Sequence, residues 1–241
     1  MPNQFFQFKQ FIVDQNQCAM KVCTDSCLFG AWVADYLEKE KNDQQYILDI
    51  GTGTGLLALM LAQKTNANID AVEIEEAATI QARNNFVASP WSNRLQVYNT
   101  PIQLFKTTNP KSYDFIISNP PFFENNLKTD NKLKNLALHS DALTLSELIV
   151  QIEFHLKSNG QFAILLPNDR SAYFIDEVQK VGFHIQSRIN VKQTPRHPFF
   201  RSMMLFGYNT SSTITKEFII KENNEYTTDF HDLLSAYYLP F

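Results

Sequence analysis

The sequence of 241 residues has few glycines, few cysteines and no long apolar run. Because no apolar stretch approaches the roughly 18 residues that span a bilayer, we expect no membrane-spanning segment. The first ten residues also lack the charged start and apolar block of a signal peptide, which favours a cytoplasmic protein. A hydrophobic share of 44% and an aromatic share of 13% indicate a globular chain with a sizeable core.

The three cysteines and the charge balance exclude further classes of protein. Cys18, Cys23 and Cys27 are separated by four and three residues, which matches no common zinc-binding spacing, so we predict no metal site. Small buried apolar residues are the simpler interpretation of the cysteines. The formal net charge of −4 argues against a broad nucleic-acid-binding face but leaves a local one open.

The scarce glycines are concentrated in one place. Three of the seven, Gly51, Gly53 and Gly55, fall within five residues. They follow a short apolar run over 46–50 and precede 56–63, whose composition is helical. This pattern predicts a strand, a tight turn and a helix. Such a unit begins a doubly wound α/β domain, in which ligands bind beyond the carboxyl ends of the strands.

The residues of this turn indicate the kind of ligand. The spacing is G-x-G-x-G, whereas the dinucleotide fingerprint is G-x-G-x-x-G, and Asp49 precedes the glycines. A carboxylate here suits a cationic ligand better than a pyrophosphate. The pattern resembles the first motif of class I S-adenosylmethionine-dependent methyltransferases. A dinucleotide site and a purely structural turn are the alternatives.

An acid at the end of the next expected strand completes the cofactor pattern. Glu73 ends a strand over 69–73, 22 residues after Gly51, and a helix is expected over 75–88. An acid near this offset accepts hydrogen bonds from the hydroxyl groups of a ribose. The alternative is a solvated acid favoured by the dipole of the following helix.

A second motif ends a later strand. The apolar run through Ile117 leads into Asn119, Pro120, Pro121 and Phe122. Two prolines cannot continue a central strand, and they stiffen the chain. The Asn119 amide oxygen and the Pro120 carbonyl could accept the two hydrogens of a conjugated amino group, while Phe122 stacks on its ring. Methyl transfer to such a nitrogen depends mainly on orientation. An ordinary loop is the alternative.

The second motif matches the [DN]-P-P-[YFW] signature of amino-group methyltransferases, which adenine-modifying and glutamine-modifying enzymes share. Other parts of the chain resemble the tRNA (adenine-N6)-methyltransferase family in particular. These are the blocks Phe8–Phe11, Cys18–Val22, Thr24–Asp25, Gly30–Trp32, Ser89–Trp91 and Asn119–Phe123. The resemblance implies that S-adenosylmethionine is the cofactor. It also implies that the substrate is a valine tRNA, modified at adenosine 37 beside the anticodon.

The resemblance also assigns the site residues. It implies a cofactor site formed by Asp49, Gly51, Thr52, Gly53, Gly55 and Glu73, approached by Thr24 and Asp25, and a target-amine site of Asn119, Pro120, Pro121 and Phe122. One position departs from the family. Pro101 stands where related enzymes often have an aspartate that binds the cofactor's adenine, so that contact would fall to backbone groups or to Gln103.

The remaining elements complete an α/β pattern. We expect helices over 25–41, 140–156 and 168–181, and strands over 95–98, 161–166, 183–191 and 202–208. The first of these helices either covers the cofactor site or packs on the edge of the sheet. The resemblance implies a Rossmann-like, seven-stranded, largely parallel sheet with an antiparallel last strand and helices on both faces. We predict one domain over 1–241, with a cap segment (1–45), a core (46–210) and a strand-and-helix extension (211–241).

Two segments are candidates for contact with RNA. The predicted final hairpin carries Lys192, Arg196 and Arg201 beside aromatic residues, with no acid over 188–201. Basic and aromatic side chains together suit phosphate contacts and base stacking, although a solvated hairpin is the alternative. The polar segment 124–138 is interpreted as a lid, an RNA contact or a solvated loop.

Two other functions remain to be weighed. A release-factor glutamine methyltransferase shares the Asn-Pro-Pro core. Such enzymes usually have tyrosine at the position of Phe122 and a helical domain longer than the 45 residues before the first strand. A binding module that has lost activity would not be expected to keep both motifs intact. The sequence gives no indication of oligomeric state.

Overall fold

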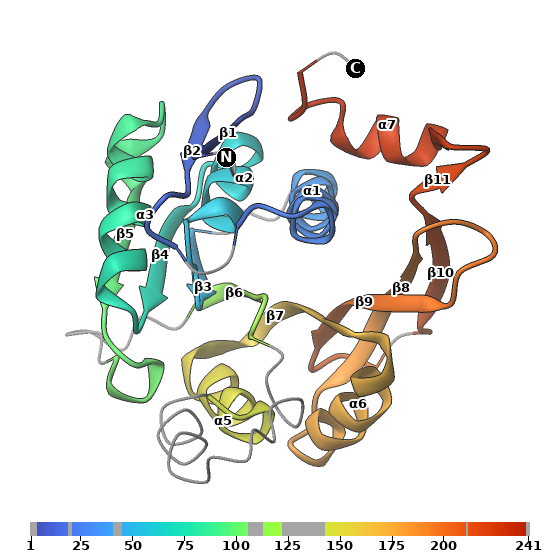
Figure 1. Ribbon diagram of the computed structural model, residues 1–241. Coiled ribbons are helices and arrows are strands. Elements are labelled where there is room, and N and C mark those ends of the chain that lie inside the picture. The colour runs from blue at the N-terminus through green and yellow to red at the C-terminus, as the bar shows by residue number, and fades with distance from the viewer. Residues whose placement is uncertain are drawn as a thin grey trace, which may run out of the picture.

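The computed structural model describes residues 4–18, 21–40, 45–105, 113–121, 143–210 and 212–239. Its central element is an eight-stranded sheet in the order β10-β8-β9-β7-β6-β3-β4-β5 (Figure 1). The strands are β3 (Tyr46–Ile50), β4 (Asn68–Glu73), β5 (Leu95–Asn99), β6 (Tyr113–Ser118), β7 (Leu156–Pro167), β8 (His184–Lys192), β9 (Phe199–Gly207) and β10 (Ile214–Ile219). Strand β9 runs antiparallel to both of its neighbours, and every other described pair within this sheet is parallel.

The expected fold class is confirmed, with one strand more than the seven expected. The additional strand is β10, which pairs in parallel with β8 from Ile214 beside Ser187 to Ile219 beside Lys192. The sequence predicted a strand at this position but not its partner. An edge strand gains its partner from a distant segment, and local residue patterns do not encode that pairing.

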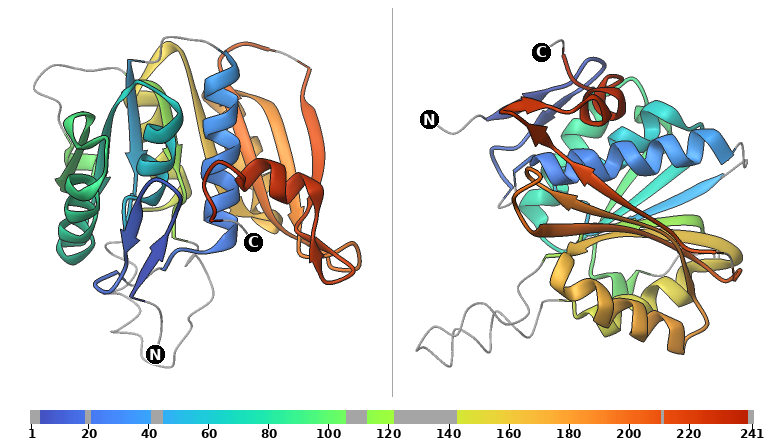
Figure 2. Two further views of the ribbon diagram at one scale, coloured as in Figure 1. Left: turned by 90° about the horizontal axis from the view of Figure 1, so that it is seen from above. Right: turned by 90° about the vertical axis from the view of Figure 1, so that its right-hand side faces the viewer.

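Helices cover both faces of the sheet (Figures 1 and 2). Their bounds are α1 (Thr24–Glu40), α2 (Leu56–Lys64), α3 (Glu76–Ala88), α5 (Leu145–His155), α6 (Ser171–Lys180) and α7 (Thr228–Leu234). The single-turn helices are η1 (Ser92–Arg94), η2 (Ile102–Leu104) and η3 (Asn168–Arg170), and two small hairpins are β1 (Phe5–Gln7) with β2 (Ile12–Asp14) and β11 (Lys221–Glu222) with β12 (Glu225–Tyr226). None of the described helices is long and apolar enough to cross a membrane.

The two largest differences from the predicted element boundaries lie at the starts of β7 and α5. Strand β7 begins at Leu156 rather than Gln161, because Leu156 already pairs with Tyr113 of β6 before the register shifts. The expected helix over 140–156 begins at Leu145 in the described part of the chain. There Thr144 and Glu147 form a capping box that satisfies backbone N–H groups at the helix start.

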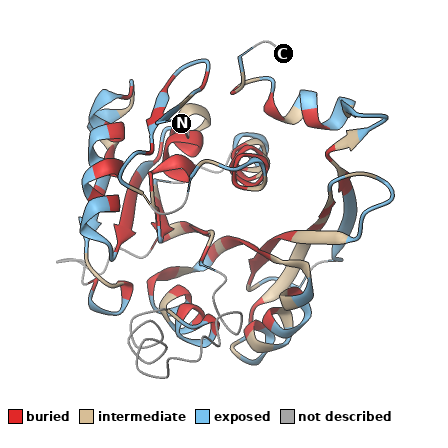
Figure 3. Cartoon of the chain, in the orientation of Figure 1, coloured by how far each residue is buried: buried red, intermediate tan, exposed pale blue. Residues whose placement is uncertain are grey.

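Alternating side chains of the sheet supply two hydrophobic clusters, one on each face. On β3, Ile47 joins the cluster with α1, α2 and α3, and Leu48 joins the cluster with α5 and α6. Ile117 and Ile116 divide in the same way on β6. Figure 3 shows the burial concentrated on the sheet and on the helix sides that face it. This two-sided burial gives the central strands a fixed register.

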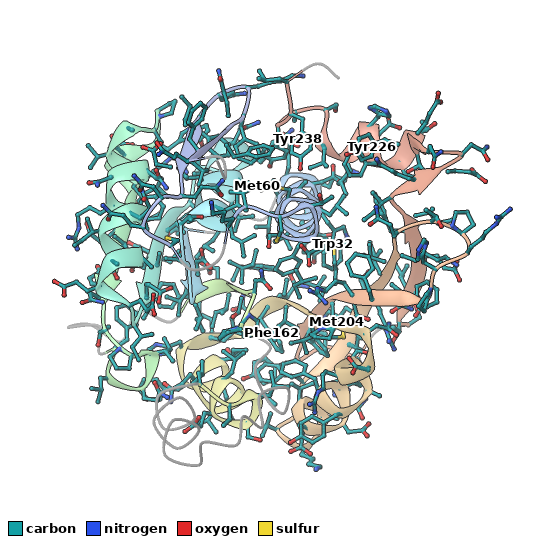
Figure 4. The ribbon with its side chains drawn as sticks, viewed as in Figure 1. Trp32, Met60, Phe162, Met204, Tyr226 and Tyr238 are labelled. Carbon is teal, nitrogen blue, oxygen red and sulfur yellow. The ribbon has the colours of Figure 1, made fainter. Side chains whose placement is uncertain are left out.

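Helix α1 packs on the face of the sheet, and its first turn reaches the carboxyl ends of the strands. Gly30 allows this packing, since a Cβ at that position would lie 2.6 Å from Met60 Sδ on α2. Met60 of α2 and Tyr238 from beyond α7 lie beside α1, which carries Trp32 (Figure 4). The mid-helix glycine, which weakens the helix prediction from sequence, is therefore the point of close helix contact.

The two ends of the described chain are tied to the same face. The Lys9 N–H donates to Tyr237 O at 2.7 Å, and the Tyr237 hydroxyl donates to Met60 O at 2.9 Å. Near them, the Gln63 amide donates to Ala236 O at 2.8 Å. The N-terminal hairpin, α2 and the segment after α7 are thus joined by hydrogen bonds, which holds α1 between them.

Candidate active site

The glycine turn connects β3 to α2 at the carboxyl edge of the sheet. Gly51, Gly53 and Gly55 have φ values of +73°, +56° and +83°, a region that other residues seldom adopt. A Cβ on Gly55 would lie 2.5 Å from Phe86 Cε1 of α3. A Cβ on Gly51 or Gly53 would have no atom of the described chain within 4 Å. The turn is therefore closed toward α3 at Gly55 and open at the first two glycines.

Asp49 lies fully buried at the end of β3 and is held by the turn that follows it. The Thr52 hydroxyl donates to Asp49 Oδ2 at 2.5 Å. Burial raises the pKa of Asp49 to about 7, opposed by the Thr52 hydroxyl and the Ala58 backbone, while the charge of Glu73 adds to the rise. Within the described chain, Asp49 Oδ1 makes no hydrogen bond of good geometry. A cation near this oxygen would compensate the buried charge.

Glu73 lies at the end of β4 and bridges two loops. Its Oε2 accepts the Gly53 N–H at 2.9 Å, and its Oε1 accepts the Glu75 N–H at 3.0 Å. The Glu73 side chain is buried, which argues against the alternative interpretation of Glu73 as a solvated acid. Each carboxylate oxygen keeps a further lone pair, so Glu73 could also accept hydroxyl donors.

Asn119 and Pro120 follow β6, the strand next to β3. Ile50 pairs with Ser118, and the Ser118 hydroxyl donates to Ile50 O at 2.9 Å, so the two motifs lie side by side. Asn119 Nδ2 donates to Ser26 Oγ at 2.9 Å. Asn119 Oδ1 is buried and has no hydrogen-bond partner within the described chain. Such an atom is costly unless a ligand satisfies it.

The rest of the second motif is only partly described. Pro120 is buried and Pro121 is exposed, and no described peptide bond is cis. Phe122 and the segment 124–138 lie outside the described residues, so the expected stacking residue and the expected lid are not located.

The start of α1 joins this site to the hairpin of β8 and β9. Thr24 is exposed at the first position of the helix, and Asp25 Oδ2 accepts from Arg201 Nε at 2.7 Å. The neighbouring Ser26 contacts Asn119, as described above. The structure therefore brings Asp25 and Arg201 together, although the sequence assigned one to the cofactor and the other to RNA.

The other two basic residues assigned to RNA differ in their surroundings. Lys192 pairs with Glu217 at 2.9 Å, and its Nζ lies 4.7 Å from the centre of the Phe199 ring. Arg196 is exposed at the tip of the hairpin. Since Lys192 already contacts an acid, Arg196 is the more accessible cation of the two.

Two asparagines that the sequence did not single out hold the site's loops. Asn85 Nδ2 of α3 donates to Thr54 O at 2.8 Å and to Asp14 O at 3.0 Å, which links the glycine turn to the N-terminal hairpin. Asn99 Nδ2 donates to the backbone oxygens of Glu73 and Ile74, each at 3.1 Å. Asparagines within a helix or at a strand end have no distinctive sequence pattern, so these contacts required the structure.

The described residues 101–105 contain no acid that could replace the aspartate that related enzymes often have at the position of Pro101. Pro101 precedes η2, and Gln103 within it is exposed. Across the described residues, no group of three or more histidines, cysteines, aspartates and glutamates could hold a metal ion. The open glycines, the buried Asp49 oxygen and the bridging Glu73 together fit a ligand with a cationic group and a hydroxylated ring.

Comparison with known proteins identifies the family. Residues 31–173 match the family described as the methyltransferase small domain. The chain is 43% identical, over 99% of both chains, to a tRNA1(Val) (adenine(37)-N6)-methyltransferase of Cytophaga hutchinsonii. A protein of the same name from Pseudoalteromonas translucida is 40% identical over 97% of this chain and 98% of its own.

The chain belongs to this methyltransferase family. The expected enzyme class and its cofactor, S-adenosylmethionine, are thereby confirmed. Among solved structures, a predicted O-methyltransferase of Agrobacterium tumefaciens matches with a TM-score of 0.65 at 16% identity, over 88% of this chain and 96% of that chain. A glycopeptide N-methyltransferase complexed with S-adenosylmethionine has a TM-score of 0.54 at 10% identity, over 75% and 94%. At these identities the two structures support the fold alone.

Proposed function

We propose that this protein transfers a methyl group from S-adenosylmethionine to the N6 amino group of adenosine 37 in a valine tRNA. Relatives that align over nearly the whole chain carry the name of this activity. The observation in the structure that supports it most directly is the buried Asn119 Oδ1 beside the glycine turn, which has no hydrogen-bond partner among the residues that the structure describes.

The glycine turn and Glu73 are the proposed cofactor site. Gly51 and Gly53 leave space for close approach, Gly55 and Thr52 shape the turn, and Asp49 faces the cationic end. Glu73 accepts the ribose hydroxyls while it continues to hold the Gly53 N–H. When bound, the cofactor supplies an electrophilic methyl group on a sulfonium. The chain's task is to hold the target nitrogen in line with that methyl group.

The target amine is proposed to bind at Asn119 and Pro120. Asn119 Oδ1 and the Pro120 carbonyl accept the two amino hydrogens, which draws the nitrogen lone pair out of conjugation and toward the methyl group. Burial around Asn119 strengthens these bonds, because water competes less for them. The extra proton leaves after transfer, so no strong general base is required of the chain. Pro121 stiffens this segment, and Phe122 is proposed to stack on the adenine.

Thr24 and Asp25 are proposed to form the N-terminal wall of the site. The Asp25 carboxylate already holds the Arg201 guanidinium, which supports an indirect role for Asp25 beside the cofactor. Arg196, exposed on the hairpin of β8 and β9, is the proposed contact with phosphates of the anticodon arm. Lys192 and Arg201 are proposed to contribute positive potential near that arm while they remain paired.

Methylation of an unmodified valine tRNA transcript tests the proposal. Label transferred from S-adenosylmethionine is expected with adenosine at position 37 and not with guanosine there, and nuclease digestion should yield N6-methyladenosine. Labelling that persists with guanosine 37 would contradict the proposed position. Labelling of a release factor, with neither tRNA modified, would favour glutamine methylation instead.

A further inference from the structure

Asn119 has an amide whose two ends are nearly alike in shape and opposite in hydrogen bonding. The oxygen accepts and the nitrogen donates, so only one orientation presents an acceptor to an amino group. In this structure Nδ2 donates to Ser26 Oγ at 2.9 Å, which leaves Oδ1 as the end without a partner among the described residues. Whatever fixes this orientation also fixes whether the site can bind an amine.

The hydroxyl of Ser26 has one hydrogen to give, and its destination decides the orientation of Asn119. Ser26 Oγ lies 3.0 Å from Cys23 Sγ. Desolvation and the neighbouring Asp25 carboxylate raise the pKa of Cys23, so the thiol stays protonated. Because a thiol is a weak hydrogen-bond donor, we assign the Ser26 hydroxyl as the donor and Cys23 Sγ as the acceptor. The Ser26 oxygen can then only accept from Asn119.

A fixed ion pair holds the backbone of Ser26 in place. Asp25 Oδ2 accepts from Arg201 Nε at 2.7 Å, and the two side chains are only 13% and 25% exposed. Asp25 Oδ1 accepts the Ser26 N–H at 3.2 Å, which holds the carboxylate against the first turn of α1. An arginine does not lose its proton in proteins, so this ion pair keeps the first turn of α1, and with it Ser26, beside Asn119.

We propose that Ser26 is a positioning residue that holds the Asn119 amide with Oδ1 toward the target amine, with its hydroxyl directed by Cys23 and its backbone held by Asp25 and Arg201. This inference rests on the proposed amino-group methylation. It gives Arg201 a part in orienting Asn119, in addition to the positive potential proposed for it above.

Ser26→Ala is the first test, with Ser89→Ala as its matched control. Both serines are buried, with exposed fractions of 6% and 7%, and Ser89 Oγ makes a 2.8 Å bond to Phe86 O at the far end of α3. In Ser26→Ala the amide loses its acceptor and turns freely, so kcat should fall roughly 10-fold. The KM for tRNA, the Kd for S-adenosylmethionine and the Tm should change no more than in Ser89→Ala. Ser26→Thr keeps the hydroxyl and should recover most of the lost kcat.

A pair of substitutions at Cys23 tests the direction of the chain independently. Cys23→Ser can still accept from the Ser26 hydroxyl, whereas Cys23→Ala cannot. In Cys23→Ala the Ser26 hydroxyl becomes free to donate to Asn119 Oδ1, which favours the unproductive orientation. We expect kcat to fall several-fold in Cys23→Ala, by less than in Ser26→Ala, and to recover in Cys23→Ser.

The side-chain amide signals of Asn119 give a readout that does not depend on activity. In protein labelled with ¹⁵N-asparagine, one Nδ2 proton should exchange slowly with water in the wild type and rapidly in Ser26→Ala. Loss of kcat in Ser26→Ala no greater than in Ser89→Ala, or unchanged amide exchange, would overturn the inference. A wild type that methylates no tRNA would instead contradict the proposed function, and the exchange measurement would still test the positioning.

Discussion

The carboxyl ends of β3 and β6 lie side by side, yet they are built in different ways. After β3, three glycines with positive φ shape a turn that is held by the pairs Thr52–Asp49 and Gly53–Glu73, and the oxygen left without a partner in the described chain belongs to the Asp49 carboxylate. After β6, the backbone is stiffened by proline, and the buried oxygen of Asn119 is left without a partner in the described chain.

The difference indicates a division of labour between the two strand ends. A turn whose shape is fixed by its glycines and internal hydrogen bonds can bind a ligand with little rearrangement. A buried acceptor without a partner contributes mainly when the correct donor arrives, so its energy is available to orient that donor. Changes at the β3 end should therefore alter folding and cofactor affinity, and changes at the β6 end should alter turnover.

Gly55→Ala should have the largest effect on folding. The added Cβ would lie 2.5 Å from the Phe86 ring at a φ of +83°, so overpacking and backbone strain add together. We expect a loss of about 3 kcal/mol in the free energy of unfolding, measured by denaturant titration without cofactor.

Gly51→Ala is the matched control for Gly55→Ala. Its Cβ would have no atom of the described chain within 4 Å, so only the positive φ counts, at about 1 kcal/mol. Gly51→Ala should nevertheless weaken S-adenosylmethionine binding, because the methyl group projects into the open side of the turn. Equal destabilisation by the two variants would contradict the described asymmetry of the turn.

The buried Asp49 should make stability depend on pH. Its pKa of about 7 in the folded protein lies above the value near 3.9 for an unfolded chain, so the folded state keeps a proton that the unfolded state releases. Stability should therefore be lost as the pH rises from about 4 through 7, by on the order of 1 kcal/mol per pH unit. Asp49→Asn, measured by the same denaturant titration, should lack this component. A stability difference between the two proteins that does not vary with pH would contradict it.

Glu73→Gln should mainly weaken cofactor binding. The amide nitrogen that replaces one oxygen cannot accept from the Gly53 or Glu75 N–H, and it accepts no ribose hydroxyl. We expect the Kd for S-adenosylmethionine to rise roughly 10-fold by calorimetry. Glu76→Gln, an exposed neighbour in the first turn of α3, should leave the Kd unchanged. Equal affinities for both variants would remove the ribose role of Glu73.

The smallest effect is expected on the RNA surface. Arg196→Ala should reduce the slope of log affinity for tRNA against log salt concentration by about 1, with no change in S-adenosylmethionine affinity. Lys180→Ala removes an exposed cation that lies at the end of α6, shortly before the start of β8, whereas Arg196 lies beyond the end of β8. An identical salt slope in both variants would favour the alternative interpretation, in which the hairpin is solvated and does not contact RNA.

The sequence predicted the two strand ends because each has a local signal. Clustered glycines and adjacent prolines restrict backbone conformation within a few residues, so Gly51–Gly55 and Asn119–Pro121 were found without the fold. It was also predictable that the two motifs lie close together, since the carboxyl ends of parallel strands meet at the same edge of a sheet. The roles of these residues remain proposals, as do the division into segments and the contacts of Phe122.

The contacts that join distant segments could not be read from the sequence. Ser26 meets Asn119 across 93 residues, and Asp25 meets Arg201 across 176. Both pairs form only after α1 packs on the sheet, and no residue pattern near either partner records the meeting. The same reason accounts for β10. Its partner β8 lies beside it in the sheet but is separated from it along the chain by the whole of β9.

Asn119→Ala, measured for binding and turnover in one preparation, tests the division of labour most directly. The account predicts an unchanged Kd for S-adenosylmethionine by calorimetry. It also predicts a single-turnover rate of tRNA methylation at least about 10³-fold below the wild type at saturating cofactor. A variant that still methylates tRNA at a comparable rate, or one whose loss of rate is matched by a loss of cofactor affinity, would contradict it.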